Sequence, residues 1–359
     1  MENASVTQPV CTQPPPPPIS TLPWHGTNQA SDFEIDIDLL QLLTDEPLGD
    51  GRYGRVYKGV FLGVVPGGSS VGSTRIPRRS LVAVKTVSQG ADPWAKEAWA
   101  LEVATLRHLG PHEHVVGALG VVTRREPLCL ALGLCEGGHL LGWLTTKRLE
   151  LDELEKSDSA QYLDRLAHEV KRFRSFAWQV ADGMAYVSAK GVVHANLSAR
   201  SVLLDADART AKIGSFGSCR HASSADVGQK GTIRCPPKLL KWMAPEAIAL
   251  ARFSSKSDVW SYGVLLWELF TVGATPFARL ADVELVGRVE RGERLHRPAL
   301  CPDDAYAEML RCWFADADKR PSFAHLADWA RQGLQDDTDA LYDYLALQRR
   351  LTELSDDDD

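Results

Sequence analysis

Three glycines near the start of the chain are spaced so that they could hold a phosphate group. Gly49, Gly51 and Gly54 follow the pattern G-x-G-x-x-G, and glycine lets backbone N–H groups approach an anion closely. Strand-forming residues follow from Val56, rather than a helix, which argues against a dinucleotide-binding turn. The glycines therefore predict either a phosphate-binding hairpin or a hairpin that is only flexible.

A lysine at the end of an apolar strand is the next residue that could bind an anion. Lys85 closes the run Leu81–Lys85, and burying its charge is costly unless an anionic group lies nearby. Glu102 recurs at helical spacing with apolar residues of the following segment and could supply that charge. The pair is either a structural ion pair or part of a nucleotide contact.

The elements that position these residues change in type along the chain. Val56–Val60 and Leu81–Lys85 are rich in strand formers, and Asp92 followed by Pro93 is typical of a helix start. From about Asp164 onward helical patterns dominate. The sequence therefore predicts a small strand-rich lobe followed by a larger helical lobe.

Composition and charge exclude several classes of protein. The 359 residues carry a net charge of −7, which argues against a nucleic-acid binder with a basic surface. The seven cysteines include no C-x-x-C pair, so neither a zinc site nor a disulfide framework is indicated. His112 and His114 flank Glu113 like a metal cluster, but a structural role in a loop is favoured and no metal site is predicted.

Membrane signals are weak, and a cytoplasmic location is predicted. The start of the chain has neither a basic segment nor an apolar one, so no signal peptide is visible. The apolar run Val259–Gly273 is almost long enough for a membrane span, but it contains Glu268 and has charged residues close by. A buried core helix is the better interpretation, and no transmembrane segment is expected.

A series of motifs, taken in order, resembles those of a protein kinase domain. The glycine loop with Lys85 and Glu102 resembles the small lobe. Lys241–Glu246 resembles the end of an activation segment, and Ser257–Val264 resembles the buried helix that anchors the large lobe. The K-W-M-A-P-E form of Lys241–Glu246 and the run W-E-L-F-T-V-G resemble tyrosine kinases in particular.

The resemblance implies an α+β, bilobal fold. We expect a five-stranded β lobe with one helix, termed αC in kinases, at residues 33–136, and a mainly helical lobe at residues 137–334. An insert near residues 145–171 lies where receptor tyrosine kinases carry one, so a receptor-type relationship is possible. Residues 1–32 are expected to form a disordered proline-rich tail, and residues 335–359 an acidic tail.

Three catalytic positions of that family hold neutral residues in this chain. Kinases use H-R-D-L-A-A-R-N in the catalytic loop, whereas this chain reads H-A-N-L-S-A-R-S, so the general base is replaced by Asn196 and a magnesium ligand by Ser201. The aspartate of D-F-G, the main magnesium ligand, is replaced by Ser215. Mg²⁺ prefers anionic oxygen ligands, so the resemblance argues against magnesium binding.

The activation switch of the family is also altered. The arginine that would bind a phosphorylated activation loop is replaced by Ala195, and no tyrosine lies between Phe216 and Pro245. Ser223, Ser224 and Thr232 remain as candidate phosphorylation sites.

Residues that would bind ATP are retained. The same resemblance makes Leu132 the gatekeeper and places Cys135 in the hinge. It also predicts an apolar stack of Leu106, Phe216 and His194 tied to Asp258, and an Arg320–Glu246 pair. The candidate ATP-contacting residues are Gly49, Gly51, Gly54, Val56, Ala83, Lys85, Glu102, Leu132, Cys135 and Leu203.

Both tails carry candidate docking motifs. The run Pro14–Pro18 could bind an SH3-like groove, although a solvated extended tail is the favoured interpretation. Tyr342 and Tyr344 each have leucine three residues later and could be phosphorylated by an active kinase and bound by an SH2 domain. The alternative, slightly favoured, is an amphipathic helix that packs on the large lobe.

These observations predict a tyrosine-kinase-like pseudokinase that acts by binding, as a signalling scaffold or allosteric partner, rather than by catalysis. ATP binding is possible, either weak or independent of metal. Two alternatives stay open: a residually active kinase that transfers the γ-phosphate by a nonstandard route, and a nucleotide-sensing switch without chemistry.

Overall fold

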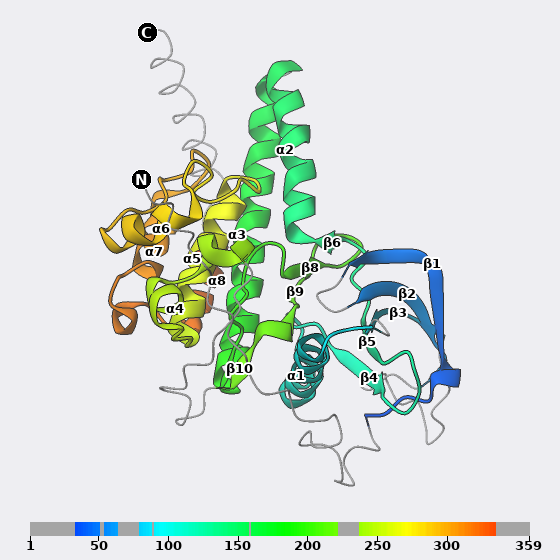
Figure 1. Cartoon of the computed structure of the whole chain (residues 1–359). Helices are drawn as coiled ribbons and strands as arrows, with labels where there is room; N and C mark the ends of the chain where they lie inside the picture. Colours follow the sequence, from blue (N-terminus) through cyan, green and yellow to red (C-terminus); the bar gives the residue numbers. More distant parts are fainter. Residues whose placement is uncertain are drawn as a thin grey trace, which may run out of the picture.

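The computed structural model describes residues 33–50, 54–63, 79–87, 90–157, 159–221 and 237–334. Within these residues the chain forms a strand-rich lobe followed by a helical lobe, which confirms the expected α+β bilobal fold (Figure 1). Both predicted tails, with Pro14–Pro18, Tyr342 and Tyr344, lie outside the described residues, as do Gly51 and the candidate phosphorylation sites Ser223, Ser224 and Thr232.

The small lobe is built on one antiparallel sheet in the order β1-β2-β3-β5-β4. Its strands are β1 (Leu40–Asp50), β2 (Arg55–Phe61), β3 (Ser80–Thr86), β4 (Ala118–Val122) and β5 (Cys129–Gly133). Val82, Val84 and Ala131 are buried in a small apolar cluster. The alternation of strand residues places Leu130 in the main core instead, so the sheet separates two apolar layers.

Helix α1 (Pro93–Leu109) packs in that main core. The Asp92 side chain accepts a hydrogen bond from the Ala95 N–H at 2.7 Å, and Pro93 is the first helical residue, as the sequence predicts. The helix ends at Gly110, whose φ of 70° favours glycine. Trp99 is buried on the inward side of the helix, which fixes the direction in which Glu102 points.

The large lobe contains seven α-helices within the described residues. They are α2 (Leu140–Ser157), α3 (Ser159–Ala189), α4 (Pro245–Leu250), α5 (Ser255–Phe270), α6 (Asp282–Glu290), α7 (Asp303–Cys312) and α8 (Phe323–Gly333). Short strands β6 (Gly138–His139), β8 (Val202–Leu204) and β9 (Ala211–Ile213) form one sheet, and β7 (Val192–Val193) pairs with β10 (Arg220–His221). The 3-10 turns are η3 (Ile37–Leu39), η4 (Phe216–Ser218), η5 (Pro237–Trp242) and η6 (Ala317–Lys319).

Helix α5 lies at the centre of this lobe. Nearly all of its residues are buried, including Glu268, so the apolar run Val259–Gly273 forms a core helix as expected. A capping box of Ser254 and Ser257 starts the helix. Among the described residues, no helix combines the length and apolar character that crossing a bilayer requires.

Helices α2 and α3 begin earlier than the sequence suggests. Helical patterns become clear only from about Asp164, yet α2 already starts at Leu140. The residues that resemble a receptor-type insert extend α2 and α3 into a hairpin, whose tip stands clear of the other helices (Figure 1). The leucine, glutamate and lysine content of α2 explains this, because these residues favour helix without producing a strong apolar stripe.

Candidate functional site

The sheet register brings predicted nucleotide-contacting residues to one face. Val56 lies opposite Lys85 across the β2–β3 pair, and Ala83 lies opposite Leu132 across the β3–β5 pair. Directly opposed residues of an antiparallel pair point to the same face of the sheet. Val56, Ala83, Lys85 and Leu132 therefore form one surface with an apolar centre and a cation at one end.

Lys85 is held by a carboxylate from α1. Its Nζ lies 2.5 Å from Glu102 Oε2, and the Glu102 side chain is almost fully buried. The pair ties α1 to the central strand of the sheet. An ammonium group in this position can meet an anionic ligand without leaving its partner, because it has three donors. The structural and ligand-binding interpretations of the pair are thus both compatible with this geometry.

Two further predicted contact residues, Gly49 and Gly54, adjoin β2 of this surface, whereas Leu203 and Cys135 belong to other segments. Gly49 is opposite Val56 in the β1–β2 pair, and Gly54 directly precedes β2. Leu203 belongs to β8 of the large lobe. Its side chain lies next to Gly214, because its Cδ1 is 3.4 Å from the position that a Cβ on this glycine would take. Cys135 is half-buried in the segment after β5, and burial raises the pKa of its thiol.

Sequence reasoning missed a second cation on this surface. Lys58 lies opposite Ala83, so it shares the face of Val56 and Lys85, and its Nζ is 3.4 Å from Glu136 Oε1. The pair links β2 to the segment that connects the two lobes. The two-residue spacing from Val56 to Lys58 is the signal that could have revealed it.

A buried carboxylate holds the loop that contains Asn196. Asp258 Oδ2 accepts from the His194 N–H at 2.7 Å, and Oδ1 accepts from the Ala195 N–H at 2.9 Å. Burial raises the pKa of Asp258 to about 7, against the opposing effect of these two hydrogen bonds. Ala195 has a φ of 58°, which is unusual for alanine, so Asp258 holds the backbone in a strained conformation.

His194 connects this loop to the segment after β9. Its Nε2 lies 2.8 Å from the Gly214 carbonyl oxygen, and its Nδ1 accepts from the Asn196 N–H at 3.2 Å, so the ring uses both nitrogens in its neutral form. Burial lowers the pKa of His194 to about 4. The ring meets Phe216 edge to face with centroids 5.0 Å apart, and Phe216 and Leu106 are both buried. The His194–Phe216 contact and the hydrogen bond from His194 to Asp258 agree with the predicted stack, and Leu106 is buried as such a stack requires.

A second buried carboxylate, that of Glu268, also holds this loop. The sequence did not indicate this contact. Glu268 Oε2 accepts from the Ala199 N–H at 2.8 Å, and burial raises the pKa of Glu268 to about 7. The partners are 69 residues apart in the sequence, so no local pattern reveals them.

The two serines of interest have different surroundings. The Ser201 hydroxyl donates to the Ser198 carbonyl at 2.9 Å and accepts from the Ser198 N–H at 3.0 Å, so it closes its own turn. Ser215 is exposed, has a φ of 65° and makes no side-chain cap to η4. Asn196 is half-buried. None of the three side chains carries a charge, so this donor set does not fit Mg²⁺.

The end of the activation-like segment is fixed by a buried ion pair. Arg320 Nη1 and Nη2 donate to Glu246 Oε1 and Oε2 at 2.6 and 2.9 Å, and the Arg320 side chain is fully buried. Arg320 also donates to the carbonyls of Phe314 and Lys256. This matches the pair that the resemblance implies.

The histidines of the candidate metal cluster serve as packing contacts. His112 stacks on Tyr186 with centroids 4.4 Å apart, and its Nε2 is 3.6 Å from Asp182 Oδ2. His114 lies 3.3 Å from the Ala211 carbonyl through Nδ1, and burial lowers its pKa. Within the described residues, no group of three or more potential ligands could hold a metal ion.

Comparison with known proteins identifies the family to which this fold belongs. A model of the protein tyrosine and serine/threonine kinase family matches residues 42–329. The chain belongs to this family. A putative tyrosine-protein kinase of Caenorhabditis elegans is 33% identical over 329 residues, which are 90% of this chain and 37% of the relative. A myoblast growth factor receptor of the same organism is 33% identical over 320 residues, covering 83% of this chain and 29% of the receptor. The tyrosine-protein kinase Fer of Rattus norvegicus is 32% identical over 281 residues, covering 78% and 30%.

Membership of the kinase family indicates what the sheet surface with Lys85 binds. A kinase domain implies ATP binding, and the apolar side chains of Val56, Ala83 and Leu132 next to Lys85 suit an adenine nucleotide. The chain spans about a third of the length of the relatives described above. The kinase domain is therefore the part of those proteins to which this chain corresponds.

Proposed function

We propose that this chain is a catalytically impaired, tyrosine-kinase-like pseudokinase that acts as a signalling scaffold or allosteric partner. One observation carries the proposal: the contacts that shape the kinase frame are present, while Asn196, Ser201 and Ser215 offer neither a general base nor anionic metal ligands. A general base contributes roughly 10²–10⁴ in rate. An amide cannot accept the substrate proton in its place.

A second candidate function is a residually active protein kinase. The relatives that cover most of this chain have names of tyrosine kinases or of a receptor, and Lys85 with Glu102 is in place for nucleotide phosphates. In this case ATP would be positioned by Lys85 and the glycine loop without the usual metal ligands.

Phosphoryl transfer by the purified chain separates these candidates. The protein is incubated with ATP, generic tyrosine substrates and either Mg²⁺ or Mn²⁺, and Lys85→Met is the matched control. We expect no transfer above that of Lys85→Met. Transfer that Lys85→Met abolishes would establish the residual kinase and overturn the scaffold proposal.

Nucleotide sensing is tested by a thermal shift. A ligand that binds only the folded state stabilises it by RT ln(1 + [L]/Kd), which is about 2.7 kcal/mol at a hundredfold excess over Kd. If the sheet surface with Lys85 binds ATP without metal, the melting temperature rises equally with and without Mg²⁺, and Lys85→Met reduces the rise. No shift at millimolar ATP would leave a scaffold without a nucleotide switch.

The partners follow from the family and from the tails. We propose that the chain binds signalling proteins in the cytoplasm: an active kinase through its lobes, an SH2 adaptor at Tyr342 or Tyr344, and an SH3 adaptor at Pro14–Pro18. We also propose that the small lobe extends from residue 33 to residue 136 and the large lobe from residue 137 to residue 334. Pull-down of SH2 domains before and after phosphorylation of the tail, with Tyr342→Phe and Tyr344→Phe as controls, tests the first of these contacts.

A further inference from the structure

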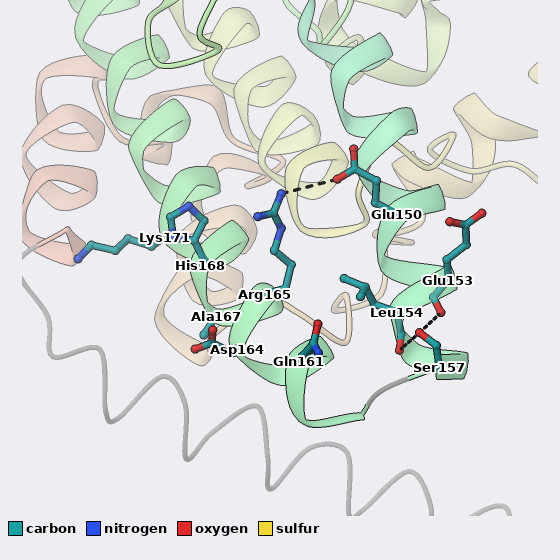
Figure 2. A pocket seen from close by; sticks show the side chains of 10 residues that line it. All are labelled: Glu150, Glu153, Leu154, Ser157, Gln161, Asp164, Arg165, Ala167, His168 and Lys171. Carbon is teal, nitrogen blue, oxygen red and sulfur yellow. Dashed lines mark hydrogen bonds and ion pairs between the residues drawn. The ribbon is translucent and has the colours of Figure 1, made fainter.

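An open groove lies between α2 and α3 near the tip of their hairpin. The cavity has a volume of about 920 Å³ and is lined by the last turns of α2 and the first turns of α3 (Figure 2). Leu154 from α2 and Ala167 from α3 provide apolar surface. Polar and charged side chains from both helices surround them (Figure 2).

The charges around the groove are not all paired with one another. Arg165 Nη2 lies 3.7 Å from Glu150 Oε2, and its Nε lies 3.2 Å from the buried Glu169. Lys171 and His168 are exposed on α3, and Figure 2 shows Lys171 pointing away from α2. Within the described residues Lys171 forms no ion pair, so it presents a cation at the edge of the groove.

Helix α8 leads directly toward this edge. Arg331 lies over the Trp178 ring, 5.7 Å from its centroid, and Gly333 packs against the guanidinium of Arg174. As α8 advances toward its last residue, its contacts on α3 therefore move toward the start of α3. Lys171 lies one helical turn beyond Arg174 in that direction. The chain leaves α8 about one turn short of the groove.

The sequence that follows α8 begins with acidic residues and continues with an amphipathic pattern, so its start complements Lys171 at the edge of the groove, whereas Glu150, Glu153 and Asp164 line the rest of it. Asp336, Asp337 and Asp339 come first and oppose the cation of Lys171 in charge. After them, apolar or aromatic residues recur at intervals of three or four, which is the spacing of an amphipathic helix: Leu341, Tyr344, Leu347, Leu351 and Leu354. From Lys171 to Gln161 the groove edge is about 15 Å long at 1.5 Å per helical residue, so the segment is long enough to cover it.

We propose that residues 335–359 dock as an amphipathic helix on the α2–α3 groove of the same molecule, with their acidic start at Lys171 and their apolar side on Leu154 and Ala167. Attachment one turn away gives the segment a high effective concentration at the groove, which favours it over a second copy or a free peptide. In this arrangement Tyr344 lies on the side of the tail helix that faces the groove, and the α2–α3 hairpin is the binding surface for the tail. This inference does not depend on whether the sheet surface with Lys85 binds ATP.

Hydrogen exchange of the full chain, measured by mass spectrometry, tests the proposal. We expect amides of residues 336–347 to exchange at least ~10-fold more slowly than in an isolated peptide of that sequence. Lys171→Glu places a like charge opposite the aspartates and should remove the protection. Lys171→Glu combined with Asp336→Lys and Asp337→Lys restores opposite charges and should recover it.

The matched control is Arg279→Glu, the same charge change in an exposed turn before α6. It should leave the protection unchanged, and a thermal melt shows that each variant is folded. The proposal fails if the parent tail exchanges as fast as the peptide, or if Lys171→Glu and Arg279→Glu have equal effects. Protection that disappears on hundredfold dilution would instead indicate docking between two copies and would overturn docking within one molecule.

Discussion

Asn196, Ser201 and Ser215 are the residues on which the proposed loss of catalysis depends, so restoring them tests it directly. Asn196→Asp, Ser201→Asn and Ser215→Asp together supply a base and oxygen ligands for Mg²⁺. Ser215 has a φ of 65°, which aspartate tolerates better than most residues, so this change should fold. We expect a thermal shift with ATP that now requires Mg²⁺, and transfer at least ~100-fold above the parent.

The double variant Ser201→Asn with Ser215→Asp is the control for that experiment. It restores the metal ligands without the base, so it should show the Mg²⁺-dependent shift but little transfer. Equal transfer by the double and triple variants would contradict the role assigned to residue 196.

His194 should make stability depend on pH. Its pKa is about 4 in the fold and about 6.5 in an unfolded chain, so between these values the unfolded state binds more protons. The stabilising effect of the neutral ring is complete above pH 6.5 and is lost as the pH falls toward 4, by about 3 kcal/mol. Urea unfolding of the parent and of His194→Phe from pH 4 to 7.5 measures this as the difference between two curves. If acidification destabilises both proteins equally, His194 is not the group that titrates.

Helix α5 depends on a glycine for its contact with α7. A Cβ on Gly263 would lie 2.6 Å from Trp313 Nε1 and 2.8 Å from Cys312 Cβ, and both Trp313 and Cys312 are buried. We expect Gly263→Ala to lower the free energy of unfolding by roughly 1–3 kcal/mol, although alanine favours helix.

Gly287 in α6 provides the comparison, because a Cβ there would meet only the flexible end of Arg291 at 3.3 Å. Gly287→Ala should leave stability unchanged or raise it by up to about 1 kcal/mol. Denaturation in urea measures the free energy of unfolding of both variants. Equal losses of stability would show that the contact between α5 and the end of α7 is not what requires glycine at position 263.

The elements that could be predicted are those with strong local signals. Val56–Val60 and Leu81–Lys85 lie within β2 and β3, and Asp92 with Pro93 starts α1, because strand alternation and capping are local. Helix α2 was missed, since its apolar stripe is weak. Of the site, the residue types were readable from motifs, whereas the Lys58–Glu136 and Glu268–Ala199 contacts join distant segments and required the fold.

At the scale of the whole molecule, buried charges hold together segments that lie far apart in sequence. Lys85 and Glu102 join the sheet to α1, Asp258 holds the loop at His194, and Arg320 reaches Glu246 in the first turn of α4. Breaking such a contact strongly destabilises the fold, because the remaining charge is left buried without a partner. A frame maintained in this way needs no catalytic group, which is consistent with a role in binding.

The Glu246–Arg320 pair allows this to be measured. Glu246→Ala leaves the guanidinium of Arg320 buried beside Trp260 and near Arg294, whose own pKa is lowered by burial and by the charge of Arg320. We expect the free energy of unfolding in urea to fall by about 3–5 kcal/mol. Glu293→Ala is the control, because it removes the partner of Arg288 from a pair whose side chains are 45% and 41% exposed, and it should cost less than about 1 kcal/mol. If the two variants lose the same stability, burial of Arg320 is not what makes its pair important, and the large lobe must be held mainly by apolar packing around α5.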